Sequence, residues 1–224
     1  MLSRFPLRSA ALLLPLLLAA CASSPTPVAY EGLGSAARLK PVKDDEAPFQ
    51  YCDAAADFAH FKAIEVDPVV IYEGADQQFG SVSAEDRKSV ADYMRVQFGD
   101  VLAAKYTLAA APGPDVLRLR LTLTGIETST PVISTLSHLM PVGLVVNSGL
   151  QAAGRNGTFF GSVTYAAELS DSATGKLFYA YVTRQTPDAL DVTASLGSLA
   201  AAREGVRIGA AHLRDRLGAS CSNA

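Results

Sequence analysis

Few side chains in this sequence could carry covalent chemistry. Three cysteines and three histidines occur among its 224 residues. The cysteines are Cys21, Cys52 and Cys221, and the histidines are His60, His138 and His212. A cysteine thiolate can act as a nucleophile, bind a metal or form a disulfide. The histidines fall in unrelated segments, with no partner at the spacing of a metal site or a catalytic triad. We therefore expect no catalytic residues, no metal ligands and no cofactor.

Two shorter motifs are weaker candidates. The Gly-Lys pair at residues 175–176 would suit a phosphate-binding loop, but Ser170 and Leu177 stand where that motif needs a glycine and a hydroxyl residue. A glycine required by a turn explains the pair better. Glu65 and Asp67 share one face of an expected strand, and we expect that face to be exposed to solvent.

The N-terminus has the layout of a secretory signal peptide. Arg4 and Arg8 precede an apolar stretch over residues 10–20, and no acidic residue occurs before Glu31. A basic start, a short apolar core and small residues at its end are typical of such signals. The stretch is too short to span a membrane. We expect residues 1–20 to be removed on export.

The end of this stretch, Leu18-Ala19-Ala20-Cys21, resembles the lipobox of bacterial lipoproteins. The resemblance implies that Cys21 becomes the first residue of the mature chain and carries acyl chains that anchor it in the membrane. Ala22 stands where an aspartate would retain such a protein in the inner membrane, which favours the outer membrane with the domain in the periplasm. The alternatives are an ordinary signal peptide next to a cysteine, or a cytosolic apolar helix.

Composition limits the partners and the number of domains. Without residues 1–20 the chain keeps 17 basic and 22 acidic residues, a net charge of −5, so nucleic acid is an unsuitable partner. Residues 21–50 are rich in Pro, Ser, Ala and Gly, which predicts a flexible linker with a mean reach of about 30 Å. Residues 51–224 are long enough for a single domain with one core. In an oxidising compartment Cys52 and Cys221 could form a disulfide, or remain two separate thiols.

The pattern of apolar residues predicts an α+β fold. Strands are expected at 62–73, around Pro68, at 117–124, and as a hairpin at 160–170 and 177–185. Helices are expected from the capping box Ser83–Asp86 to about residue 102, and over 193–217 with Gly218 as a C-terminal cap. We expect a mostly antiparallel sheet with these two main helices packed on one face.

The compositional anomaly of the chain is an uncharged segment. The 27 residues between Glu127 and Arg155 include no Asp, Glu, Lys or Arg. Three interpretations stay open: a buried crossing between strands, a docking surface for a protein partner, or contact with a membrane. As a docking surface, residues 129–154 would present apolar side chains at Leu139, Val142, Leu144 and Val145.

Three stretches carry a resemblance to a known family. They are Val82–Arg87 at the start of the first helix, Pro112–Arg120 leading into a strand, and Glu168–Lys176 at the hairpin. In these stretches the chain resembles the bacterial lipoproteins grouped as domain of unknown function 3313 (DUF3313). The order of elements is also similar, more loosely, to lipoproteins of the curli-secretion and penicillin-binding-protein-activator types. Neither resemblance implies catalytic residues.

The sequence thus favours a lipid-anchored protein of the cell envelope that acts as a non-catalytic binding or assembly module. Its expected partners are the membrane, through the lipid anchor, and an unknown envelope protein. The alternative is an envelope enzyme whose active site is assembled from distant positions and forms no motif.

Overall fold

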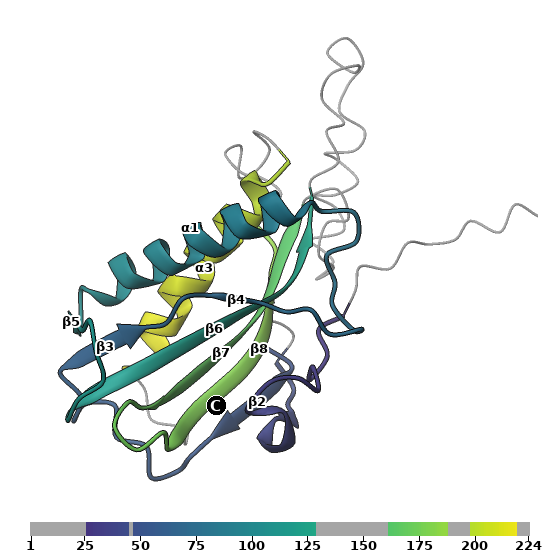
Figure 1. Ribbon diagram of the computed structural model, residues 1–224. Helices are drawn as coiled ribbons and strands as arrows, with labels where there is room; N and C mark the ends of the chain where they lie inside the picture. The colour runs from purple at the N-terminus through teal and green to yellow at the C-terminus, as the bar shows by residue number, and fades with distance from the viewer. Residues whose placement is uncertain (1–25, 45–46, 129–160, 188–197, 219–224) are drawn as a thin grey trace, which may run out of the picture.

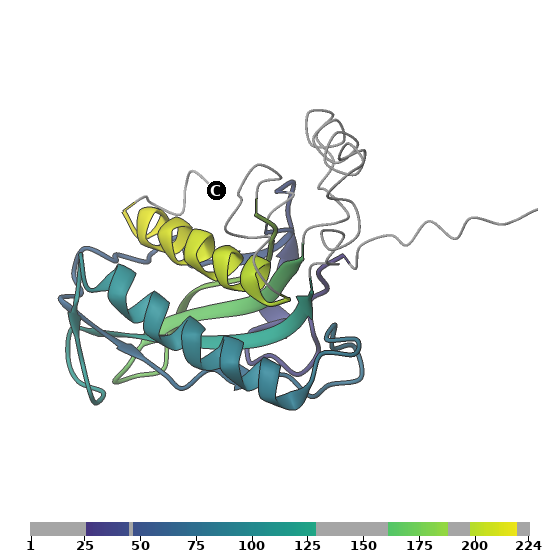
Figure 2. The same ribbon diagram turned by 90° about the horizontal axis from the view of Figure 1, so that it is seen from above.

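The computed structural model describes residues 26–44, 47–128, 161–187 and 198–218. These residues form an eight-stranded mixed sheet with two long helices on one of its faces (Figure 1, Figure 2). The strand order is β1-β2-β8-β7-β6-β3-β5, and β4 pairs with β6 beyond the end of β3. The β1-β2-β8-β7-β6 part is antiparallel, whereas β3, β4 and β5 are joined in parallel. The predicted α+β fold with a mostly antiparallel sheet is confirmed.

The strands are β1 Lys40–Pro41, β2 Phe49–Cys52, β3 Ala63–Val66, β4 Val70–Ile71, β5 Thr107–Leu108, β6 Val116–Glu127, β7 Ser162–Asp171 and β8 Leu177–Gln185. The helices are the short 3-10 helix η1 Ala36–Arg38 and the α-helices α1 Ala84–Leu102 and α3 Ala200–Arg216. The predicted strand at 62–73 is therefore two short strands, β3 and β4, separated around Pro68, which has no N–H to donate to a neighbouring strand.

Helix α1 forms as its sequence predicts. The Ser83 side chain accepts a hydrogen bond of 3.0 Å from the backbone N–H of Asp86, and Glu85 and Asp86 lie at the positive end of the helix dipole. Four side chains spaced four residues apart along one side of the helix are fully buried; they are Val90, Met94, Phe98 and Leu102.

Strands β6, β7 and β8 form the centre of the sheet. Along β6 the leucines at 117, 119, 121 and 123 face the helices and are fully buried. The β7–β8 hairpin is confirmed. In its turn the Asp171 carboxylate accepts hydrogen bonds from the backbone N–H groups of Ala173 and Thr174. Gly175 has the positive φ, +72°, that this turn requires. Strands β6 and β7 are also direct neighbours, paired antiparallel as far as Glu127 opposite Ser162.

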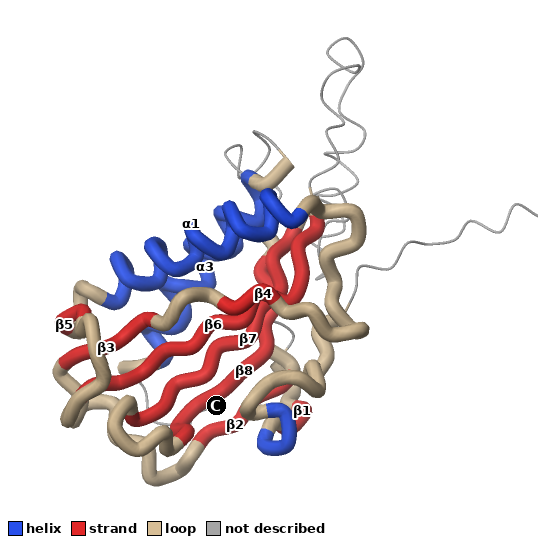
Figure 3. Tube along the Cα trace, in the orientation of Figure 1, coloured by secondary structure: helices blue, strands red, loops and turns tan. Residues whose placement is uncertain are grey.

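The folded part begins before residue 51, where the sequence analysis set the boundary. The segment before β1, drawn in purple in Figure 1, lies over the face of the sheet that the helices leave open. Tyr30 and Leu33 are buried there against Ala166 and Val182, and η1 follows at the same place (Figure 3). Farther towards the N-terminus, the carbonyl of Thr26 accepts a hydrogen bond from the Gln78 side chain, at 2.9 Å.

Helix α3 lies close to the sheet because it carries glycines where it meets β7 and β8. A Cβ atom at Gly205 would lie 2.9 Å from the backbone oxygen of Gln185, and a Cβ at Gly209 would overlap the hydroxyl of Tyr165. The helix starts at Ala200, and residues 193–197 of the predicted helix lie outside the described residues. Gly218 does not have a positive φ, so the helix ends without the predicted left-handed glycine cap.

Candidate functional site

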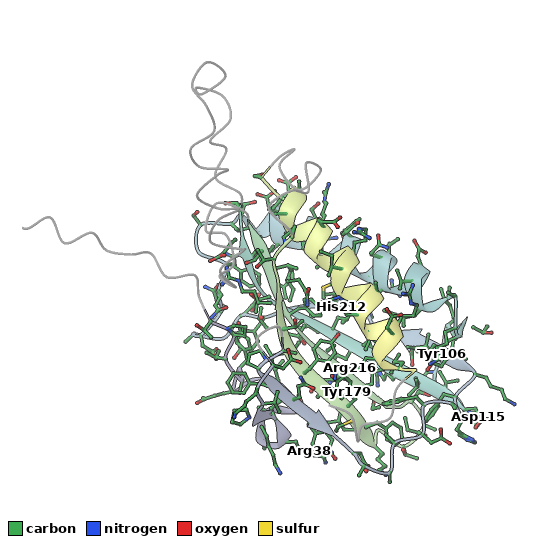
Figure 4. The ribbon with its side chains drawn as sticks, turned by 180° about the vertical axis from the view of Figure 1, so that it is seen from behind. Arg38, Tyr106, Asp115, Tyr179, His212 and Arg216 are labelled. Carbon is green, nitrogen blue, oxygen red and sulfur yellow. The ribbon has the colours of Figure 1, made fainter. Side chains whose placement is uncertain are left out.

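The clearest pocket of the described residues lies between α3 and strands β7 and β8. We call it the tyrosine pocket. Its lining consists of Asp44, Ala47, Tyr165, Tyr179, Tyr181, Thr183, Gln185, Gly209, His212, Leu213 and Arg216. In Figure 4, His212 and Arg216 project from α3 on the side where Tyr179 lies. The alternation of strand side chains explains the lining, because residues 179, 181, 183 and 185 of β8 all point to the helix face.

A hydrogen-bond network closes one side of the tyrosine pocket. The Tyr179 hydroxyl donates to the Gln50 amide oxygen at 3.2 Å, and the Gln50 amide nitrogen donates to the Asp44 carboxylate at 3.0 Å and to the Ala47 carbonyl at 2.9 Å. Asp44 also lies 3.6 Å from the Arg216 guanidinium. The pocket wall is therefore cross-linked by polar contacts from α3, β2, β8 and the chain before β2.

Burial keeps the phenols of this pocket protonated. It raises the pKa of Tyr179 to about 12, and it raises the pKa of Tyr181 well above its ordinary value, with the neighbouring tyrosines adding to the shift. Neutral phenols can donate and accept hydrogen bonds but do not act as bases near pH 7. The pocket offers about 40 Å³ to the centres of water molecules, which is room for roughly three waters. Sites for metabolites are about 300 Å³ or more.

A second polar cluster lies where β6 ends and β7 begins. The side chain of Arg184, which is only 11% exposed, forms an ion pair with Glu127. Arg184 also donates to the Ser162 hydroxyl at 3.0 Å, and that hydroxyl donates to Glu127 at 3.0 Å. Burial lowers the pKa of Arg184, and Glu127 opposes this shift. We call these three residues the ionic clasp; it ties the ends of the strands that flank the uncharged segment.

The carboxylates at 65 and 67 do not form an acidic pair. Asp67 is buried, contrary to the expectation of a solvent-facing position, and it accepts two hydrogen bonds of 3.0 Å from Arg118. Arg120 lies 3.6 Å from the same carboxylate. Hydrogen bonds from Arg118 to Asp67 raise the pKa of the arginine. This cluster stabilises the parallel β3–β6 pair and has no geometry for acid–base chemistry.

The histidines are not brought together. His60 lies at the surface, 2.8 Å from Asp115, and His212 lines the tyrosine pocket. His138 lies outside the described residues. Within the described ranges, no three His, Cys, Asp or Glu side chains are grouped as metal ligands would be. In the same ranges, no helix is both long and apolar enough to cross a membrane.

Of the remaining candidate residues, the structure describes Cys52 but not the others. Cys52, at the end of β2, takes part in a disulfide. Cys21 and Cys221 lie outside the described residues, so the pairing of Cys52 with Cys221 stays a prediction. The expected partner surface also lies outside them, with Leu139, Val142, Leu144 and Val145.

Sequence reasoning missed both the tyrosine pocket and the ionic clasp. The residues of the clasp are separated by up to 57 positions, and only the sheet register brings them together. A local signal existed for the pocket. One face of the strand carries Tyr179, Tyr181, Thr183 and Gln185, and so many polar groups are unusual on a face that packs under a helix.

Comparison with solved structures finds distant likenesses. The PelC dodecamer from Paraburkholderia phytofirmans is 12% identical and matches over 74% of this chain and 94% of the PelC chain, with a TM-score of 0.37. A Xanthomonas campestris protein of the DUF330 family is 10% identical over 72% of this chain and 88% of its own, with a TM-score of 0.34. Among curated proteins, none matches this sequence.

The family comparison is more specific. The family model described as a protein of unknown function, DUF3313, matches residues 29–213. The match starts at the N-terminal segment packed on the sheet, includes both long helices, and ends within the last turn of α3. It therefore covers nearly all of the described fold, and the chain belongs to the DUF3313 family.

Proposed function

We propose that this chain is a lipid-anchored protein of the bacterial cell envelope that acts by binding. Cys21 carries the acyl chains, the domain faces the periplasm from the outer membrane, and residues 129–154 form the contact surface. The apolar side chains of that surface include Leu139, Val142, Leu144 and Val145.

The observation that carries this proposal is the pairing of β6 with β7. The two strands are neighbours in register up to Glu127 opposite Ser162, so a turn of two to five residues would be enough to join them. Instead, 34 residues intervene, 128–161. Connections of this length inside compact domains are uncommon, and they are usually either functional or linker segments. An insertion that the sheet does not require, and that lacks charge over 27 residues, suits contact with an apolar partner.

The ionic clasp supports the same interpretation. It holds Glu127 and Ser162 together. Glu127 is the last residue of the sheet before the insertion, and Ser162 is the first one after it. The clasp also neutralises the charges at the root of the insertion, because Glu127 is paired with Arg184. A firm root of this kind would present the insertion at one defined place on the domain.

Among the residues that the structure describes, the tyrosine pocket is the candidate site for the alternative, an envelope enzyme. That pocket has room for a few waters, and its phenols stay protonated near pH 7. Chemistry there would need a larger substrate site than this pocket provides, although His212 is among its lining residues. The binding proposal requires no such site.

The test places a photo-crosslinking amino acid at Leu144 in the full chain expressed in cells, with Leu108 as the matched control. Leu108 is a half-exposed leucine in β5, far from the root of the insertion. We expect a discrete adduct from position 144 and none from position 108. A folded, acylated chain that gives no adduct at 144 contradicts the proposal.

A substitution then separates a contact surface from a core segment. Leu144→Asp should leave the melting temperature nearly unchanged if Leu144 is on the surface, because exposed substitutions cost under about 0.5 kcal/mol. It should unfold the domain if Leu144 is buried, because a buried unpaired charge costs several kcal/mol. Melting followed by circular dichroism gives the answer, and loss of the adduct from a neighbouring crosslinker at Val142 supports the contact.

A further inference from the structure

The tyrosine pocket combines a permanent positive charge with neutral hydroxyl groups. Arg216 supplies the charge. The hydroxyl groups belong to Tyr165, Tyr179, Tyr181 and Thr183. In Figure 4, Arg216 and His212 extend from α3 on the side where Tyr179 lies. A guanidinium next to groups that can donate hydrogen bonds is a combination that suits an anion.

The carboxylate in the pocket lining, Asp44, does not use up the charge of Arg216. Asp44 accepts hydrogen bonds from the Gln50 amide at 3.0 Å and from the Ala47 backbone N–H at 3.1 Å. Its distance to the Arg216 guanidinium is 3.6 Å, which is longer than a hydrogen bond between charged groups. A guanidinium has several N–H groups in a planar fork. Arg216 therefore keeps donors for a ligand, while Asp44 is held in the wall by its other contacts.

The charge of Arg216 acts on the phenols of the pocket. It lowers the pKa of both Tyr179 and Tyr181, although burial raises each pKa by more. Both phenols therefore remain protonated and can donate hydrogen bonds. The Tyr179 hydroxyl already donates to the Gln50 side chain at 3.2 Å. Tyr181, two residues farther along β8, is the phenol of this strand that suits a ligand near Arg216.

The size of the pocket restricts which anion fits. Its 40 Å³ hold roughly three waters, which is about the space of a carboxylate group, a carbon with two oxygens. Phosphate and sulfate ions are larger and carry more charge than one guanidinium balances. The planar carboxylate also matches the parallel N–H groups of an arginine. The Arg216 side chain is 38% exposed, so a ligand can reach it from solvent.

We propose that the tyrosine pocket is a carboxylate-binding site, in which Arg216 and Tyr181 donate hydrogen bonds to the carboxylate oxygens. A small free acid and the C-terminus of a polypeptide both present this group, and only the group itself fits into the pocket. The pocket consists of residues other than the proposed contact surface at 129–154. Either proposal can therefore fail without the other.

The test uses acetate as the probe and the full chain in deuterated detergent micelles. Saturation-transfer NMR of the acetate methyl group measures binding, and we expect saturation at roughly millimolar acetate. Arg216→Gln should weaken binding at least about tenfold, because it removes the charged donor. Arg214→Gln is the matched control and should bind as the parent does, since Arg214 is a similarly exposed arginine of α3 that pairs with Asp215 outside the pocket lining. Tyr181→Phe, which keeps the ring, should weaken binding several-fold and provides the test if Arg216→Gln does not fold, as checked by circular dichroism.

Competition experiments identify the group that is bound. Acetamide has the shape of acetate without its charge, and it should not displace acetate. N-acetylglycine carries a carboxylate like that of a polypeptide C-terminus; if it displaces acetate, the site accepts a polypeptide end, and if it does not, the ligand is a small free acid. The proposal is wrong if acetate does not bind, if acetamide or chloride at the same concentration displaces it, or if Arg216→Gln binds it as well as Arg214→Gln does.

Discussion

The close approach of α3 to β7 makes a quantitative prediction at Gly209. A Cβ atom there would overlap the Tyr165 hydroxyl oxygen and lie 3.0 Å from the ring carbon that bears it. Tyr165 is fully buried and packs edge-on against Phe98, with ring centres 5.7 Å apart, and against Tyr181 at 6.2 Å. Phe98 and Tyr181 therefore limit how far the ring can move away from an added Cβ atom.

Gly209→Ala should destabilise the domain by about 2 kcal/mol. Overpacking of a rigid core costs about 1–3 kcal/mol, and the severity of this overlap favours the upper limit. Alanine regains about 1 kcal/mol over glycine inside a helix. For a domain of this size the net loss corresponds to a fall of roughly 4–8 °C in melting temperature. Urea denaturation followed by circular dichroism measures the free energy of unfolding.

A double variant isolates the overlap from other effects. Tyr165→Phe removes the hydroxyl that the added Cβ atom would overlap. In that background Gly209→Ala should cost at least about 1 kcal/mol less than in the parent. Gly99→Ala in α1 is the matched control, since its nearest neighbour would be the Leu108 side chain at an ordinary 3.9 Å; it should be neutral or stabilising. If Gly209→Ala behaves like Gly99→Ala, the close packing of α3 on the sheet is refuted.

Three further predictions follow from other parts of the domain. Arg184→Met should cost roughly 2–3 kcal/mol in urea denaturation, because it leaves Glu127 unpaired and only partly exposed; combining it with Glu127→Gln should restore part of that loss, and no recovery would argue against the ion pair. Backbone N–H groups of Thr174 and Ala173 lower the pKa of Asp171, so its contribution to stability is present above the unfolded pKa near about 3.9 and is lost as the pH falls through the lower folded pKa. Asp171→Asn should therefore flatten the acid limb of the stability profile, and an unchanged limb would disprove this role. Mass spectrometry of peptides prepared without reduction should find Cys52 joined to Cys221 by a disulfide. A free thiol at Cys221 would show that Cys52 has another partner.

The local features of the fold could be predicted because their causes lie within a few residues. The Ser83–Asp86 contact and the three-and-four spacing that follows specify α1, and the turn before Gly175 specifies the β7–β8 hairpin. The strand order could not be predicted in this way. Placing β3 parallel to β6, and β2 beside β8, depends on contacts between residues distant in sequence, and apolar patterning gives no information about which strands pair.

The incorrect expectation for Asp67 has a physical origin. Alternation along a strand predicts only which face a residue occupies, whereas Arg118 and Arg120 on the adjacent β6 cover and pair this carboxylate. A neighbouring strand, rather than the local pattern, decides what Asp67 contacts.

The N-terminal segment changes how an anchored domain of this kind would work. Its Pro-, Ser- and Gly-rich composition predicted a linker as far as residue 50, with a mean reach of about 30 Å. Tyr30 and Leu33 instead pack on Ala166 and Val182, so the chain after Thr26 belongs to the core. Only residues 22–25 would then separate the domain from an acylated Cys21. A long linker would let a domain search the periplasm for its partner, whereas so short a connection would hold Thr26 within about 18 Å of an acylated Cys21. A partner of a domain anchored in this way would have to lie close to the membrane.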